Sequence, residues 1–306
     1  APRRPELVLA GFRDSLERYL PESSAMNGTQ VTAIKSALGA LIASRVAEPV
    51  SRSELVQAVR AAAPGVQFPT LDRTRLFTAT EPELRWVERS ELVLDWERFS
   101  GRGARDFPGV DDWRDGLQEL AETSDWVRSS GVSRVIRLEG TRRLSVSVAI
   151  GSAFSATGGF AIEVENRGAL LRTDQHAGSD TPAYNWIAEE GGGEQADEIA
   201  VVLSVKRAIA DDVRGFLSGS LPLELVLHSS DAMVSADQMN LAVEAAKQRI
   251  SNVISKTRAG VVHLFLAVPG PFALFLGHRL NATCTIQCYE HTGGANYAPA
   301  FRIPCT

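Results

Sequence analysis

The sequence predicts an α/β fold of two fused Rossmann-like units with a mainly parallel sheet, preceded by a small helical region. Three observations indicate this fold. After residue 130, short apolar stretches alternate with stretches of helical periodicity. The alternation occurs twice, around 133–166 and around 199–290. Stretches such as IAVVLSV (199–205) are apolar throughout, which is typical of parallel strands that helices cover on both faces.

The first 127 residues are expected to form a helical connector region, with a domain boundary before residue 128. Pro49 ends a first short helix, and Ser51 and Glu54 form a capping box that opens a second. The expected elements are helices over 29–47 and 51–63, a charged loop over 97–115 and a polar helix over 114–129. The two short helices fit either a winged-helix-like module or a simple linker, and both interpretations stay open.

Residues 128–306 are expected to form the second domain, in which β-branched and apolar strands alternate with amphipathic helices. A long polar insert over 167–198 separates the two units. The expected strands cover 133–140, 159–166, 199–205, 222–229, 260–268 and 282–290, and the expected helices cover 141–154, 206–217, 235–255 and 271–280.

Composition narrows the classes of function. Of 306 residues, 44% are hydrophobic, which is enough for one large or two ordinary domains. The net charge of −5 argues against a broad duplex-DNA or membrane surface, because such surfaces need a basic excess. No apolar run reaches the 18 residues of a membrane span. The chain has no initiator Met and no signal-peptide core, so we expect a fragment of a longer protein.

The chain has three cysteines, Cys284, Cys288 and Cys305. A small and odd number of cysteines does not indicate a disulfide framework. We therefore expect a reducing, cytoplasmic compartment. The sequence has no metal-type CxxC pair, and its five histidines show no zinc spacing. We accordingly expect no metal and no resident cofactor.

In open α/β sheets, ligands bind beyond the carboxyl ends of the strands, beside helix N-termini. The first such corner contains Thr141, Arg142, Arg143 and Ser145. A helix dipole disfavours a cation at its N-terminus by up to about 1 kcal/mol. A bound anion would reverse that penalty. The alternative is that both arginines are solvated or paired with nearby glutamates.

The second corner contains Ser204, a candidate N-cap, followed by Lys206. The strand again leads into basic residues at the expected start of a helix. One such helix start carries little information, whereas two in equivalent positions of a repeated unit form a pattern. Both corners are therefore predicted to hold phosphate groups.

The third corner, in the stretch VVHLFLAVPGPFALFLGHRLN, contains Gly270, Pro271 and Phe272. Pro271 is expected at the first helical position, where a missing N–H costs no hydrogen bond. Gly270 would let the backbone approach a ligand, and the amides of Phe272 and Ala273 would be free donors. The ring of Phe272 is expected either to stack on a base or to pack in the core.

Three further aromatic residues lie near the expected strand ends, namely Trp186, Tyr289 and Tyr297. Nucleobases stack on exposed aromatic side chains with about 1–3 kcal/mol each. We therefore include these rings in the candidate ligand site. Burial of Trp186 in a core remains the alternative.

Several ordered segments resemble the SAVED domain family: RLEGTRRLSVSVAIGSAF, GFAIEVENRG, VVLSVKRAIADDV, HLFLAVPGPFALFLGHRLN, IQCYE and YAPAFRI. They cover about 128–304. The resemblance implies two fused Rossmann-like (CARF-like) units that sense a cyclic di- or trinucleotide in cyclic-oligonucleotide-based anti-phage signalling (CBASS). Many relatives carry a Trp where this chain has Leu171, so Trp186 is expected to substitute for it.

The family joins its sensor to a nuclease, a TIR domain, a protease or membrane helices. SELVQAVR and WERFSGRG look most similar to the connector of HNH-nuclease–SAVED effectors. Residues 1–130 contain no His, so they hold no HNH metal site. Any cutting domain, and with it any contact with double-stranded DNA, is therefore expected outside this chain.

Three hypotheses follow. The first is a receptor that self-associates into oligomers on ligand binding, through two non-identical halves that make a heterologous contact. The second is a Rossmann-like nucleotide-using enzyme, such as a ring nuclease that degrades its own ligand. Its candidate nucleophiles, Ser145, Ser204 and Asp174, have no obvious partner His, and His176 is the nearest. The third is a scaffold without a small ligand. We favour the first and assign no catalytic residue.

Overall fold

The computed structural model describes most of the chain from residue 26 onward. The described residues are 26–44, 57–59, 61–63, 73–79, 92–99, 107–129, 132–175, 178, 181–233, 235–280 and 284–305. The expected capping box at Ser51 and Glu54 and the candidate partner His176 lie outside them.

The first sheet has the strand order β2-β1-β3-β4-β5. β1 to β4 run parallel, and the short β5 pairs antiparallel with β4. The strands are β1 (Thr74–Ala79), β2 (Leu92–Asp95), β3 (Val135–Glu139), β4 (Ala161–Asn166) and β5 (Ala169–Arg172).

The second sheet has the order β11-β10-β9-β7-β8-β6. Its four central strands run parallel, and β6 and β11 are antiparallel edge strands. The strands are β6 (Ile187–Glu190), β7 (Glu198–Val205), β8 (Leu223–Ser229), β9 (Val261–Ala267), β10 (Thr285–Gly293) and β11 (Asn296–Ile303).

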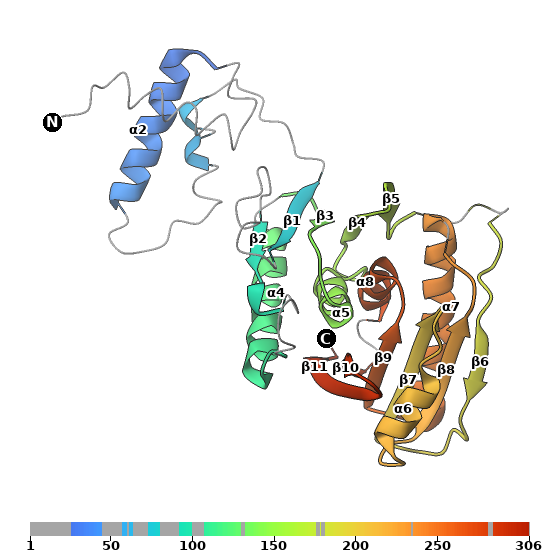
Figure 1. Ribbon diagram of the computed structural model, residues 1–306. Helices are drawn as coiled ribbons and strands as arrows, with labels where there is room; N and C mark the ends of the chain where they lie inside the picture. Colours follow the sequence, from blue (N-terminus) through green and yellow to red (C-terminus); the bar gives the residue numbers. More distant parts are fainter. Residues whose placement is uncertain are drawn as a thin grey trace.

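Helices fill the space between the sheets and cover the outer face of the second sheet. Figure 1 shows α5 and α8 side by side in the middle of the molecule, and their residues belong to the main core cluster. α6 packs on the outer face of the second sheet in a separate cluster. The helices are α2 (Gly28–Ser44), the 3-10 turn η3 (Glu97–Phe99), α4 (Val110–Ser129), α5 (Leu144–Ala153), α6 (Ala210–Leu217), α7 (Ala236–Thr257) and α8 (Gly270–Arg279).

The two sheets repeat one arrangement. The order β2-β1-β3-β4-β5 corresponds strand by strand to β8-β7-β9-β10-β11. In both, a long helix (α4 or α7) precedes the third strand, and a ten-residue helix (α5 or α8) follows it. The predicted pair of fused Rossmann-like units is therefore confirmed. We call them unit 1 (β1–β5 with α4 and α5) and unit 2 (β7–β11 with α6, α7 and α8).

The repeat extends to single residues. Arg137 pairs with Glu163 across β3 and β4, as His263 pairs with Gln287 across β9 and β10. Gly151 follows Arg137 by fourteen positions, and Gly277 follows His263 by the same fourteen. The two units can thus be superposed position by position from the third strand to the end of the following helix.

The units meet where α5 crosses α8. A Cβ atom on Gly151 would lie 2.1 Å from the carbonyl oxygen of Leu274, and one on Gly277 would lie 2.1 Å from that of Val148. Only glycine permits such close approach of two helix backbones. Both glycines are the eighth residue of their helix, so the crossing is a local two-fold axis.

Each unit also packs its long helix against the other unit's last strand. Trp113 of α4 makes an edge-to-face contact with Phe301 of β11, with ring centroids 4.8 Å apart. Asn240 of α7 donates through Nδ2 to the carbonyl oxygen of Arg172 in β5 (2.9 Å). The units are therefore interlocked as well as adjacent.

Several expected boundaries need correction. The expected domain boundary before residue 128 falls inside α4, and β1 and β2, which the sequence analysis missed, belong to unit 1. The polar insert over 167–198 contains two further strands, β5 and β6. β1 and β6 pair with strands distant in sequence, so local periodicity does not reveal them, whereas β5 forms a two-residue hairpin with β4 that the sequence analysis missed.

The N-terminal helix α2 starts at a capping box that the sequence analysis did not identify. Asn27 Oδ1 accepts from the Gln30 amide (2.9 Å), and Gln30 Oε1 accepts from the Asn27 amide (3.0 Å). Val31 and Ile34 form a small cluster with Ala63. Among the described residues, no helix is long and apolar enough to cross a membrane.

Candidate ligand-binding site

The corner after β3 is held tightly against the end of β1. Gly140 has a φ of +87°, and a Cβ there would lie 2.4 Å from the carbonyl oxygen of Thr78. The Thr78 hydroxyl donates to the carbonyl oxygens of Glu139 (3.1 Å) and Thr141 (3.3 Å). The strand order β2-β1-β3-β4 also reverses between β1 and β3, because β2 is added on one side of β1 and β3 on the other. Ligands of open α/β sheets bind at such a point.

Arg142 is a cation with incomplete hydrogen bonding at this corner. One of its terminal nitrogens donates to the carbonyl oxygen of Gly140 (2.7 Å), whereas its Nε is enclosed and has no partner in the described part of the chain. Burial lowers the pKa of Arg142 to about 10, so the guanidinium still carries its charge at pH 7. A buried, under-satisfied cation is stabilised by an anion with free acceptor oxygens.

A cavity of about 210 Å³ opens beside Arg142 at the carboxyl ends of β3 and β4. Two of its acidic groups already have cations, because Glu139 pairs with Arg75 (2.7 Å) and Glu165 with Arg137 (3.3 Å). The cavity is lined by Arg137, Leu138, Glu139, Gly140, Arg142, Val164 and Glu165. Arg142 is thus the lining cation that has no ion pair within the described residues.

The first turn of α5 already holds an anion from unit 2. The carboxylate of Glu290, at β10, accepts from the Ser145 amide (3.0 Å) and from the Ser145 hydroxyl. Arg143 lies 3.9 Å from the same carboxylate, donates through Nε to the carbonyl oxygen of Phe99 (3.0 Å) and stacks over Phe107. Arg143 and Ser145 are therefore engaged within the protein, and sequence reasoning missed Glu290.

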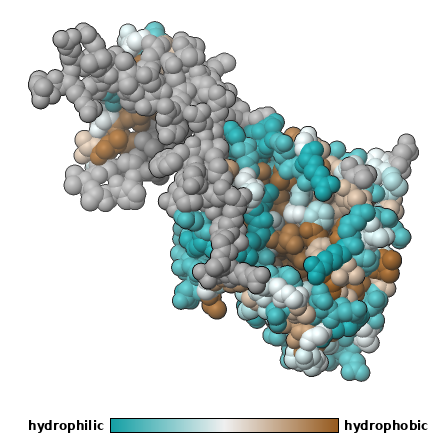
Figure 2. Space-filling view, viewed as in Figure 1, coloured by the Kyte–Doolittle hydropathy of each residue, from teal (hydrophilic) through white to brown (hydrophobic). Residues whose placement is uncertain are grey.

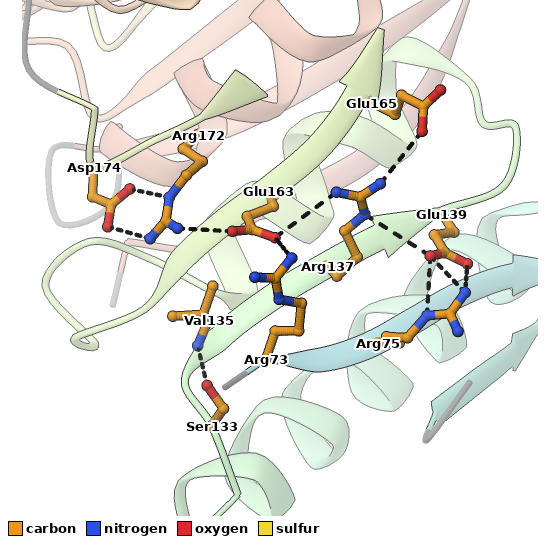
Figure 3. A network of polar contacts seen from close by, with 10 residues as sticks. All are labelled: Arg73, Arg75, Ser133, Val135, Arg137, Glu139, Glu163, Glu165, Arg172 and Asp174. Carbon is orange, nitrogen blue, oxygen red and sulfur yellow. Dashed lines mark hydrogen bonds and ion pairs between the residues drawn. The ribbon is translucent and has the colours of Figure 1, made fainter. Parts of the chain in front are cut away.

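An ion-pair ladder crosses the outer face of unit 1 (Figure 3). At its centre, the fully buried Glu163 lies 2.9 Å from Arg172, 3.2 Å from Arg73 and 3.9 Å from Arg137. The charges of the ladder balance, because four arginines (Arg73, Arg75, Arg137 and Arg172) meet four carboxylates (Glu139, Glu163, Glu165 and Asp174), so it leaves no net cation for a ligand.

The second corner differs from the prediction. α6 begins at Ala210, so Lys206 does not lie at a helix N-terminus. Lys206 is exposed, has a φ of +68°, and donates its amide to the carbonyl oxygen of Ser229 (2.8 Å). The first turn of α6 carries Asp211 and Asp212, which satisfy the helix dipole and repel phosphate. The prediction of a second basic helix start is therefore wrong.

Ser204 lies inside β7 and is not an N-cap. Its hydroxyl is 2.9 Å from Nδ1 of His228 on β8, the partner that sequence reasoning did not find because the two strands pair only in the fold. The pair lines a cavity of about 320 Å³ together with Asp211 and Asp212. The acids that line this cavity are paired, Asp211 and Glu189 with Arg214 and Asp212 with Arg207, so among the described residues the cavity offers a phosphodiester no unpaired cation.

The third corner is closed by its own backbone. The carbonyl oxygen of Pro269 accepts from the amides of Phe272 (2.9 Å) and Ala273 (3.2 Å), so neither amide is a free donor. Phe272 is fully buried, and the predicted base-stacking face is absent. Pro271 is buried at the second rather than the first helical position, and Gly270 precedes it. This corner is a packing element.

The candidate aromatic rings are mostly occupied within the protein. Trp186 is buried against Phe272 and donates through Nε1 to the carbonyl oxygen of Ala242 (3.1 Å), so its core alternative is the correct one. Tyr289 stacks on Phe265, with centroids 4.4 Å apart. Tyr297 is buried, but its hydroxyl has no partner within the described residues.

The residues that line the cavity beside Arg142 all belong to unit 1. Figure 2 shows apolar residues in a hollow near the middle of the two-sheet body, with hydrophilic residues around it. Figure 1 places α5 and α8 in this region. The structure thus brings Thr141, Arg142, Arg143 and Ser145 together at one corner with Glu290, and places Lys206 and Gly270 at the ends of the neighbouring strands β7 and β9. No group of metal-ligating residues occurs in the described ranges.

Two interlocked Rossmann-like units, with a basic corner at the point where the strand order reverses, define a class of α/β protein whose candidate site lies at the carboxyl ends of the strands. The sequence comparison identifies the family. The profile "SMODS-associated and fused to various effectors sensor domain" (SAVED) matches residues 118–303. The chain belongs to the SAVED family, and the predicted resemblance is confirmed.

Two curated relatives are named CD-NTase-associated protein 4. The protein from Acinetobacter sp. (strain ATCC 27244 / 9458) is 34% identical over 216 residues, which are 70% of this chain and 46% of the relative. The protein from Moraxella osloensis is 31% identical over 219 residues, which are 71% of this chain and 46% of the relative. The chain spans about half the length of these relatives.

Solved structures show the same fold. The Acinetobacter baumannii Cap4 SAVED/CARF-domain containing receptor with 3'3'3'-cAAA has a TM-score of 0.70 and 26% identity, covering 98% of this chain and 66% of the other. The same receptor with 2'3'3'-cAAA has a TM-score of 0.70 and 27% identity, covering 97% and 65%. Both are structures of a receptor with a cyclic trinucleotide.

Proposed function

We propose that this chain is the receptor part of an anti-phage effector and binds a cyclic oligonucleotide, with a cyclic trinucleotide of adenylate as the first candidate. The observation that carries the proposal is the enclosed, unpartnered Nε of Arg142 at the strand ends where the chain reverses direction in unit 1. The similar Acinetobacter baumannii receptors, solved with two cyclic trinucleotides, support the ligand class.

The phosphates are assigned to the corner from Thr141 to Ser145. Arg142 supplies the charge and the free N–H, and Thr141 is exposed beside it. Lys206 contributes only long-range attraction, because it is exposed and lies four residues before α6. Charge-assisted hydrogen bonds to phosphate contribute about 1.5–3 kcal/mol each, so Arg142 is the residue to test.

The test is a panel of cyclic di- and trinucleotides, including 3'3'3'-cAAA and 2'3'3'-cAAA, scored by melting temperature and then by calorimetric titration. Arg142→Ala is expected to weaken binding by about ten- to a hundred-fold. Arg249→Ala, which removes a surface arginine 3.7 Å from Glu190, is the matched control and should bind as the wild type does. Equal affinity of Arg142→Ala and wild type would show that the site is misplaced.

Assembly and activation belong to the same proposal. We infer that ligand binding drives self-association and thereby activates an attached effector domain, for which an HNH nuclease acting on double-stranded DNA is our candidate. Light scattering at saturating ligand should show an increase in mass, and an unchanged mass would contradict the inference. Magnesium-dependent plasmid cleavage should require the full-length protein and ligand, and this chain alone should not cleave.

A further inference from the structure

Glu290 occupies the N-terminus of α5 from the other unit. Its carboxylate accepts from both the amide and the hydroxyl of Ser145, and Arg143 lies 3.9 Å away. Ser145 is 1% exposed, and the Glu290 side chain is 12% exposed, so the contact is largely withdrawn from solvent. The place that a phosphate would take at this helix is filled by a carboxylate of the protein itself.

The electrostatics of this place favour an anion in general. The first amides of a helix have no partner within the helix and carry positive partial charge. Arg142 and Arg143 immediately precede α5 and add two further positive charges. Both a carboxylate and a phosphate satisfy these groups, but a phosphate brings more charge and more acceptor oxygens. A ligand phosphate and Glu290 therefore compete for the same donors.

We propose that Glu290 is an internal anion that holds the unliganded receptor closed and is displaced by a ligand phosphate. This inference rests on the proposed receptor function and adds its regulation. Arg142 immediately precedes α5 and lines the cavity at the carboxyl ends of β3 and β4, so its guanidinium is where the incoming phosphate makes its first charge-assisted contact. Displacement then transfers the Ser145 donors from Glu290 to the ligand.

Packed aromatic rings connect Glu290 with α4 and the segment before it, so release of Glu290 can be transmitted to them. Glu290 pairs with Ala298 in the β10–β11 hairpin, and the same hairpin carries Phe301. Phe301 packs against Trp113 of α4 and against Phe99, whose carbonyl oxygen binds Arg143. Motion of the hairpin is thus coupled to α4 and to the segment that leads toward the N-terminus.

The contact of Glu290 with the N-terminus of α5 has no counterpart at the N-terminus of α8. By the strand registers, the residue of unit 1 that corresponds to Glu290 is Asn166 of β4, which has no charge. The residues of unit 2 that correspond to Arg142 and Arg143 are Val268 and Pro269. One ligand phosphate is therefore expected to act as the trigger, and it acts at α5.

The test compares Glu290→Gln with wild type. Glutamine keeps the shape and an acceptor oxygen but removes the charge, so 3'3'3'-cAAA should bind at least about tenfold more tightly by calorimetry, which corresponds to about 1.4 kcal/mol. Without ligand, hydrogen exchange should be faster at the Ser145 amide and along 285–303 in the variant. Glu194→Gln removes a charge from an exposed residue and should leave both measurements unchanged. Glu290→Asp, which keeps the charge on a shorter side chain, should lie between wild type and Glu290→Gln.

Weaker or equal binding of 3'3'3'-cAAA by Glu290→Gln would overturn the proposal, because Glu290 would then be a ligand contact or a structural cap. If no cyclic nucleotide binds either protein, the receptor function fails, and sulfate decides the regulation alone. Sodium sulfate, compared with sodium chloride at equal ionic strength, should then raise the melting temperature of Glu290→Gln more than that of wild type. An equal rise would reject the internal anion.

Discussion

The two units share strand order and spacing but carry different chemistry on their outer faces. In unit 1, the equivalent positions of β3 and β4 hold arginine and glutamates, and in unit 2 they hold histidine, glutamine and two aromatic residues. The pairs are Arg137 and His263, Glu139 and Phe265, Glu163 and Gln287, and Glu165 and Tyr289. The difference arises because α6 covers the outer face of unit 2, where its Phe216 packs on Phe265 and Tyr289. An outer face that is covered by the apolar side of a helix favours aromatic rings, whereas unit 1 satisfies its outer face with ion pairs.

The inner faces, in contrast, are alike in the two units. Gly151 and Gly277 occupy the same position of α5 and α8, and each admits the other helix's backbone. The contact between the units therefore depends on shape, and shape tolerates little variation, whereas the outer faces and the corners are free to differ in charge.

The largest expected effect comes from breaking the shared contact. Gly151→Ala or Gly277→Ala places a Cβ 2.1 Å from a backbone oxygen that cannot rotate away. Each change should cost about 4 kcal/mol or more of unfolding free energy. Urea denaturation followed by circular dichroism measures this.

The control for the glycine pair is Gly215→Ala in α6. A Cβ added at Gly215 would have no other atom within 4 Å, so the methyl group of an alanine meets open space there. Alanine should stabilise this helix by up to about 1 kcal/mol. A cost below about 1 kcal/mol at both crossing glycines would show that the helices can move apart.

Glu163→Gln sharpens the difference between the outer faces. The carboxylate is buried among three arginines, and its removal leaves the ladder with one excess positive charge, although Glu165 and Asp174 still pair with Arg137 and Arg172. We expect a loss of about 2–3 kcal/mol, below the usual 3–5 because the arginines are partly exposed. Glu165→Gln on the same face has a largely exposed side chain and should change stability by less than about 0.5 kcal/mol. Equal effects of the two changes in urea titrations would contradict a buried ladder.

His278 makes the contact between units sensitive to acid. Burial lowers its pKa to about 4, and its Nδ1 faces the carbonyl oxygen of Phe154 across the crossing. In the unfolded chain His278 binds a proton near pH 6.5, whereas in the folded chain it does so only near pH 4. The stability that neutral His278 contributes is therefore complete above pH 6.5 and is lost as the pH falls toward 4. The loss should reach about 3 kcal/mol. His278→Gln should lose less between pH 7 and pH 4.5, and parallel curves for both proteins would reject this role.

The smallest effect concerns the corner of unit 2. Lys206 has a left-handed backbone, which glycine adopts without steric strain. Lys206→Gly should therefore raise the unfolding free energy by about 0.5–1 kcal/mol. Its affinity for a cyclic trinucleotide should fall by no more than about threefold, against the larger loss for Arg142→Ala. A larger loss for Lys206 would move the site to unit 2.

Much of this fold follows from local sequence. The apolar strands of 199–205 and 260–268 and the helix of 235–255 are predicted within a few residues. The strands are buried on both faces and read as continuous apolar runs, and the helix is buried on one face and shows helical periodicity. β1 and β2 are short, and α6 starts later than the basic residues suggest. Arg142 is predictable from its place after a strand, whereas Glu290 is not, because it reaches α5 from 145 residues away.

The reciprocal packing of α4 on β11 and α7 on β5 gives the molecule the architecture of a dimer that happens to be one chain. Its two halves are joined covalently only through the segment that contains β6, between Arg172 and Glu198. A protease cut in that segment would leave the interface between the halves intact. Separately produced halves should accordingly reassemble when mixed, whereas either half alone would present an uncovered apolar helix to solvent.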